Sequence, residues 1–225
     1  VLGYLWSLVR PLLFFGVLYI VFQTVFKVGT GVPNYPVQLL VAIILWTFFL
    51  QATSGCVQCL LAREGLLRKM RFPRLVIPLA VALTALFQLL TNLIPIVIFA
   101  LASGVTPRLS WLEFIPLIGL LAVFAVGLGM LLSVLFVRFR DIQPIWDVTA
   151  QIMFYGSPII YPVYKYERGL SSPPVHLHLG PIGHLLMVNP VAAVIAQARN
   201  ALVGPVPGLQ GANPSAATAL GGTEW

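Results

Sequence analysis

Long apolar runs, separated by short polar segments, constrain this sequence more than any other feature. Five such runs lie at about 11–27, 37–57, 75–102, 112–137 and 142–163. A helix needs roughly 20 residues to cross the hydrocarbon core of a bilayer, and each run approaches or exceeds that length. Only 8% of the 225 residues are charged, whereas soluble domains carry about 25%. The sequence therefore predicts an all-α integral membrane protein, a polytopic helical bundle forming one domain over residues 1–225.

A basic segment between the second and third runs, residues 63–74, sets the expected orientation. Its sequence is REGLLRKMRFPR, and it holds five of the 13 Lys and Arg residues. At about 100° per residue, Leu66, Leu67 and Met70 share one face of a short helix. Pro73 disfavours helix at the residue before it, so this helix ends close to the third run. An amphipathic basic helix between two spans is expected to lie flat on the cytoplasmic surface.

The distribution of basic residues supports this orientation. With residues 63–74 in the cytoplasm, eight Lys and Arg residues lie inside and five outside, and the N-terminus is cytoplasmic. The formal charge of +7 then reflects span ends near anionic headgroups, which fits better than a nucleic-acid-binding face. We expect a multi-pass protein with membrane lipid, and no nucleic acid, as a partner.

The region 164–204 is expected to lie on the outer side without crossing the membrane. It is rich in Pro and Gly, and its apolar stretch 185–202 is interrupted by Asn189-Pro190 and Arg199. This pattern favours short re-entrant helices. A sixth span that would return the chain to the cytoplasm is absent from the sequence. The chain also begins at Val1, so we expect a missing N-terminal segment and a missing last span rather than a five-span variant.

Signatures of catalysis are missing from the sequence. It contains no GxxxxGK[ST] loop that would hold a nucleotide phosphate, so we expect no cofactor on this chain. His176, His178 and His184 lie in the outer region without a carboxylate cluster, and we expect no metal site. Cys56 and Cys59 form a CxxC pair that could be redox-active or metal-binding, but packing between helices is the simpler interpretation. Gly127 and Gly129 could allow close contact between helices, although two glycines alone indicate it only weakly.

Asp147 is the one ionisable residue set clearly inside an apolar run. A carboxylate within a span is a functional candidate. It lies only six residues after Asp141, so it could instead reach the cytoplasmic interface or pair with Arg138 or Arg140. Aromatic residues are also frequent around the second and fifth runs. They could stack against sugar rings in a conduit, although lipid-facing bulk is the simpler interpretation.

The order of motifs resembles the permease subunit of ATP-binding-cassette exporters for lipid-linked polysaccharides, the O-antigen and teichoic-acid export type. The resemblance covers about residues 2–204. It rests on LGYLWSLVRPLL (2–13), YPVQLL with LWTFF (35–49), LLRKMRFPRLVIPLA (66–80), GLGMLLSVLFVRFRDI (127–142), YGSPIIYP (155–162), VNP (188–190) and Arg199. The basic KMRFPR and VRFRD elements are the most specific of these.

The resemblance implies a homodimeric permease in the bacterial inner membrane that exports a polyprenyl-diphosphate-linked glycan. ATP and Mg²⁺ would be held by two copies of a partner ATPase. The family has six spans in each permease.

Four groups of residues follow from the resemblance. The ATPase-coupling element would be Arg63, Glu64, Leu67, Arg68, Lys69, Met70, Arg71 and Arg74. The conduit candidates are Trp46, Phe49, Tyr155 and Tyr161. The headgroup or gate candidates are Tyr4, Trp6 and Arg10. The break of the outer re-entrant helices would involve Ser157, Pro158, Pro162, Asn189 and Pro190.

Three other functions remain open from the sequence. A related permease could export a drug or a small lipid. A membrane enzyme acting on polyprenyl-linked sugars would need clustered carboxylates or a metal site, and the acidic residues here are scattered. A membrane scaffold without transport would leave the basic loop and the outer breaks unexplained.

Overall fold

The computed structural model describes residues 2–21, 34–63, 65, 75–105, 109–157, 159 and 189–203. Helices account for most of these ranges. They are α1 (Leu2–Tyr19), α2 (Tyr35–Val57), α3 (Cys59–Ala62), α5 (Val76–Ala102), the 3-10 helix η2 (Leu109–Glu113), α6 (Phe114–Arg138), α7 (Ile142–Gly156) and α10 (Pro190–Val203). The prediction of a polytopic helical membrane protein is confirmed.

Three helical segments are long and apolar enough to cross a bilayer in the described part of the chain. They are Tyr35–Val57, Val76–Ala102 and Leu109–Arg138, the last combining η2 with α6. Their bounds lie within about three residues of the predicted second, third and fourth spans. The first and fifth differ more. Helix α1 begins at Leu2 and runs through Pro11, and α7 ends at Gly156. Whether these two helices cross the membrane stays a prediction.

Local chemistry sets two of the helix ends. Ser157 has φ −87° and ψ 148°, an extended conformation that terminates α7. Proline disfavours helix at the residue before it, and Pro158 follows directly in the sequence. Helix α5 ends in a Schellman motif, in which Gly104 (φ 78°) donates to the Leu101 carbonyl and Val105 donates to the Ala100 carbonyl, both at 3.1 Å. Glycine suits this left-handed position because it has no Cβ to clash.

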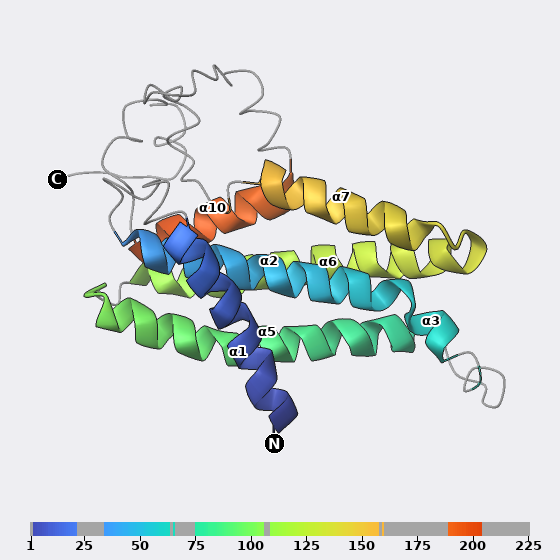
Figure 1. Cartoon of the computed structure of the whole chain (residues 1–225), viewed down its shortest axis with the longest axis horizontal. Coiled ribbons are helices and arrows are strands. Elements are labelled where there is room, and N and C mark those ends of the chain that lie inside the picture. The colour runs from blue at the N-terminus through green and yellow to red at the C-terminus, as the bar shows by residue number, and fades with distance from the viewer. Residues whose placement is uncertain are drawn as a thin grey trace, which may run out of the picture.

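Helix α2 lies at the centre of the bundle, and the other helices pack around it. It contacts α1, α5, α6, α7 and α10. Helices α2, α5, α6 and α7 run along the long axis, whereas α1 crosses α2 and α5 obliquely (Figure 1). Nearly all of α2 is buried, from Val37 to Val57, while α5 and α6 expose Leu, Ile, Val and Phe on their outer faces. Such faces suit contact with lipid, so α2 forms the core and α5 and α6 form part of the wall.

Small residues let the helices approach one another closely. A Cβ added at Gly129 of α6 would lie 3.1 Å from the Cβ of Cys56, and one at Gly55 would lie 3.0 Å from Val81. Gly127 has open space instead. Helix association within a bilayer depends on such close packing, because lipid tails provide no hydrophobic drive between helices. Cys56 and Cys59 are free and buried, which fits their interpretation as packing residues.

The charged turns gather at one end of the bundle. Helix α3 and the turn between α6 and α7 lie at one end, and α10 lies toward the other (Figure 1). Arg63, Arg138 and Arg140 are exposed there, and Arg138 lies 5.7 Å from the centre of the Phe139 ring. Basic residues favour the cytoplasmic side. This arrangement fits the predicted orientation, which stays a prediction.

Candidate functional site

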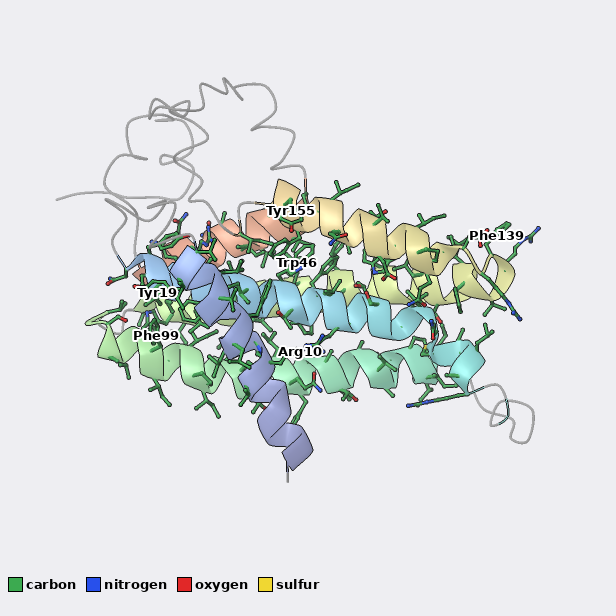
Figure 2. The ribbon with its side chains drawn as sticks, in the orientation of Figure 1. Arg10, Tyr19, Trp46, Phe99, Phe139 and Tyr155 are labelled. Carbon is green, nitrogen blue, oxygen red and sulfur yellow. The ribbon has the colours of Figure 1, made fainter. Side chains whose placement is uncertain are left out.

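An aromatic column joins α2 to α7 inside the protomer. We define it as Trp46 and Phe49 of α2 with Trp146 and Phe154 of α7. The ring centre of Trp46 lies 5.5 Å from Phe49 and 5.6 Å from Phe154, and Phe49 lies 6.1 Å from Trp146. Figure 2 places Trp46 between the two helices. Tilted and edge-on contacts at these distances stabilise a pair of helices beyond the burial of apolar area.

The column continues onto neighbouring helices and covers two of the predicted conduit residues. Phe49 stacks on Phe124 of α6 at 5.9 Å, and Phe154 contacts Phe14 of α1 at 6.1 Å. As a result Trp46 is 4% exposed and Phe49 is fully buried. Within one copy of the chain neither side chain can line an open passage. Their role as conduit residues therefore stays a prediction for an assembled transporter.

Tyr155 is the described conduit candidate that lies on the surface. It is 60% exposed, and its ring packs edge-on against Phe154 at 5.3 Å. It lies close to the end of α7 (Figure 2). Tyr161, the fourth conduit candidate, lies outside the described residues. The column thus holds Tyr155 from behind and leaves its outer face free.

Helix α7 carries a row of polar side chains on its uncovered face. We call Asp147, Gln151 and Tyr155 the α7 polar stripe; they are spaced four residues apart and all are exposed. Four-residue spacing puts them on one side of the helix. Trp146 and Ala150 are buried and face the bundle. With a rise of 1.5 Å per residue, Gln151 lies about 15 Å along the axis from Asp141. The stripe therefore extends from the charged turn well into the depth of the bundle.

The C-terminal end of α2 leads directly into the predicted coupling element. Helix α2 ends at Val57, Gln58 forms a turn, and α3 ends before Arg63, which is exposed. The other predicted coupling residues lie outside the described residues; they are Glu64, Leu67, Arg68, Lys69, Met70, Arg71 and Arg74. Their role stays a prediction.

A buried arginine joins three segments at the opposite end. Arg199 of α10 is 5% exposed. Its Nε donates to the backbone carbonyl of Gln38 at 3.2 Å, and its Nη2 donates to the carbonyl of Ile159. A guanidinium stays charged in proteins, and its fork of N–H donors can serve several carbonyls at once. Arg199 thus links α10 to the first turn of α2 and to the segment that follows α7.

The predicted break of the outer helices is partly visible. Asn189 Nδ2 donates to Ser157 Oγ at 3.0 Å, and Asn189 Oδ1 accepts from the Val191 backbone N–H at 3.1 Å. Asn189 is therefore a capping residue for α10, which begins at the exposed Pro190. The structure brings Ser157 and Asn189 together, and their part in an outer re-entrant unit stays a prediction. Pro158 and Pro162 lie outside the described residues.

The headgroup candidates lie on α1. Tyr4 and Trp6 belong to this helix, and their side chains lie outside the described part of the structure. Arg10 is exposed on the same helix (Figure 2). The described residues contain no group of three or more His, Cys, Asp or Glu that could hold a metal ion.

The sequence did not predict a role for Trp146, and it did not predict that Arg199 would be buried and hydrogen-bonded. Trp146 Nε1 donates to Ser54 Oγ at 3.0 Å, which fixes α7 to α2. The spacing of Trp146, Ala150 and Phe154 at four residues was a usable signal for the buried face of α7. The partners of Arg199 lie up to 161 residues away in the chain. No local pattern could have identified them.

Comparison with known proteins adds a family. The protein-family model described as "ABC-2 type transporter" matches residues 1–170 of this chain. An O-antigen export system permease protein RfbA of Klebsiella pneumoniae is 35% identical over 161 residues, 71% of this chain and 61% of the relative. A second one from the same species is 33% identical over 72% of this chain and 62% of the relative. A Myxococcus xanthus RfbA is 28% identical over 82% and 70%. The chain spans about six tenths of the length of the two Klebsiella relatives.

Proposed function

The chain belongs to the ABC-2 type transporter family, and on that premise we propose that it is the permease subunit of an ATP-driven polysaccharide exporter. The cargo is a polyprenyl-diphosphate-linked glycan, moved from the cytoplasm to the outer side of a bacterial inner membrane. Relatives named as O-antigen export permeases support this class of cargo. ATP is hydrolysed by a partner subunit, since the printed sequence has no phosphate-binding loop.

The α7 polar stripe is the observation that carries the proposal. Polar and ionisable side chains within a span face a water-filled cavity or a protein neighbour, and Gln151 of the stripe lies about 15 Å along the helix axis from the charged turn. Asp147, Gln151 and Tyr155 are exposed in a single copy. A second copy of the chain, placed with its own stripe opposite, would enclose a polar passage. Soluble sugars could move through such a passage while the lipid tail stays in the bilayer.

The remaining parts have roles in the same proposal. Residues 63–74 dock on the ATPase, with two ATPase copies for two permeases, because a basic loop offers complementary charge to a soluble partner. Tyr4, Trp6 and Arg10 of α1 lie near the entry of the lipid headgroup. The outer unit around Asn189 and Arg199 lies near the exit. Tyr155 lines the passage, and Trp46 and Phe49 support its wall from behind through the aromatic column.

Depletion of the protein in its native cell tests the cargo. We expect a lipid-linked glycan to accumulate on the cytoplasmic side, and the wild-type gene to restore export. A Gln151→Leu variant, which removes the middle polar side chain of the stripe, is expected to restore less export than Thr91→Ala, a control on the outer face of α5. Unchanged glycan pools on depletion would contradict the polysaccharide assignment and favour export of a drug or small lipid.

Association with the ATPase provides a separate test. Replacing Arg68, Lys69 and Arg71 together with Glu reverses the charge of the coupling element. We expect the ATPase to be lost from the purified complex, because complementary charge would become repulsive. A control with Lys27 and Arg108 changed to Glu, on the opposite predicted side, should keep it. An intact complex in the triple variant would exclude this segment as the docking site.

A further inference from the structure

Polar side chains join α2 to α7 near the cytoplasmic end of the bundle. Gln58 Nε2 donates to Gln143 Oε1, and Trp146 Nε1 donates to Ser54 Oγ at 3.0 Å. We call these four residues the α2–α7 joint. Ser54 and Gln58 are four residues apart on one side of α2, and Gln143 and Trp146 are three apart on α7. The two hydrogen bonds thus form consecutive rungs between the same faces of two helices.

The α2 side of the joint is held rigidly by other helices. Cys56 Sγ donates to the Pro78 carbonyl of α5 at 3.3 Å. A Cβ added at Gly55 would lie 3.0 Å from Cγ1 of Val81 in α5, and one at Gly129 of α6 would lie 3.1 Å from Cys56, so α2 is in close contact with both helices. Close-packed helices move as a unit, since their interfaces deform little. By contrast, one face of α7 is exposed along the helix. Near its first turn, α7 contacts α2 through the joint.

The joint also lies where the chain changes direction. The regular α2 helix stops at Val57, and Gln58 stands between it and α3, which leads into residues 63–74. A displacement of that loop therefore reaches Gln58 within a few residues. On the other side, Gln143 lies in the first turn of α7, the helix that carries the polar stripe.

From this position we propose that the α2–α7 joint carries the movement of the coupling loop to the wall of the passage. Gln58 and Gln143 are positioning residues: they make α7 follow the end of α2 when the ATPase moves the loop at 63–74. Ser54 and Trp146 hold the second rung, and the aromatic column continues the connection toward Tyr155. This inference rests on the proposed function and adds the route by which ATP hydrolysis reaches the passage.

Charge-pair variants of the complete exporter test the proposal. Gln58→Leu and Gln143→Leu each remove one side of the first rung, whereas the double variant Gln58→Glu with Gln143→Lys restores a donor–acceptor pair of similar length. The reversed double variant, Gln58→Lys with Gln143→Glu, does the same with opposite charges. Gln58→Lys with Gln143→Lys is the matched control, because its two charges repel. The measurements are ATP turnover of the purified complex and the amount of glycan exported in cells.

We expect the single variants to keep the ATPase bound and hydrolysing while glycan exported per ATP falls at least about fivefold, the lower end of typical coupling between two sites. Both opposite-charge doubles should restore export, and the like-charge double should not. Wild-type export in the single variants would overturn the proposal. So would export that stays low in both opposite-charge doubles, or loss of the bound ATPase, which would make these residues part of the docking surface. Absence of glycan export in the wild type would instead contradict the proposed function.

Discussion

At the scale of single residues, Arg199 makes the longest-range connection in the described structure. Hydrogen bonds to a charged group contribute ~1.5–3 kcal/mol each, and Arg199 donates to two backbone carbonyls. Two such bonds contribute ~3–6 kcal/mol, so we predict that Arg199→Leu lowers the melting temperature of the detergent-solubilised protein by about 6–24 °C. Arg199→Lys should recover only part of this, because a lysine ammonium lacks the planar fork of donors. Asn200→Leu, at the exposed neighbouring position, is the control. Equal melting temperatures for Arg199→Leu and Asn200→Leu would contradict this role.

Two glycines on α6 give a matched pair of substitutions. Alanine at either position gains the same helix propensity, about 1 kcal/mol. At Gly129 its Cβ would lie 3.1 Å from Cys56, whereas at Gly127 it would meet nothing within 4 Å. Overpacking costs typically ~1–3 kcal/mol. Gly129→Ala should therefore be less stable than Gly127→Ala by ~1–3 kcal/mol in urea or thermal unfolding. The reverse order would mean that α2 and α6 are not closely packed.

At the scale of elements, the start of α10 is held by the hydrogen bonds of Asn189, the residue that precedes the helix. Loss of an N-cap costs ~1 kcal/mol, and Asn189 also binds Ser157. Asn189→Ala is expected to raise the amide exchange rate in the first turn of α10 about fivefold. Asn189→Asp keeps the acceptor for the Val191 N–H but loses the donor to Ser157, so it should lie between the two. Hydrogen exchange by mass spectrometry of this segment decides the order. Equal exchange in all three proteins would show that packing alone holds α10.

The elements also separate what the sequence could predict from what it could not. Helices α2, α5 and α6 were predicted closely because length and apolar composition alone set their extent. The break after Gly156 followed from Ser157-Pro158. The burial of Trp46 and Phe49 was not predictable. In water, polar residues mark the outer face of a helix, but in a bilayer both the core and the lipid-facing side are apolar. Only the neighbouring helices reveal which face of α2 is covered.

At the scale of the whole molecule, the same reasoning explains the contrast between α5 and α7. Helix α5 exposes Leu83, Phe87 and Ile94, which lipid can cover. Helix α7 also exposes Ile145, Val148 and Ile152, but among them stand Asp147 and Gln151, which lipid covers only at a cost. A bundle with one apolar wall and one polar-striped wall is therefore incomplete as a single copy. This asymmetry is the physical reason for expecting a second copy against α7 rather than against α5.

The orientation of the whole bundle can be tested with the two turns that the structure describes. Basic residues favour the cytoplasmic side, so the turn at Phe139, flanked by Arg138 and Arg140, should lie inside and the Schellman turn at Ser103 outside. Phe139 is 53% exposed and Ser103 is exposed, so cysteines at either position should be accessible to reagent. Cys56 and Cys59 are buried and should react little. We predict that a membrane-impermeant maleimide labels Ser103→Cys in intact spheroplasts, and labels Phe139→Cys only after permeabilisation. The opposite pattern would place residues 63–74 outside, where no ATPase could reach them, and the coupling role proposed for that loop would fall with it.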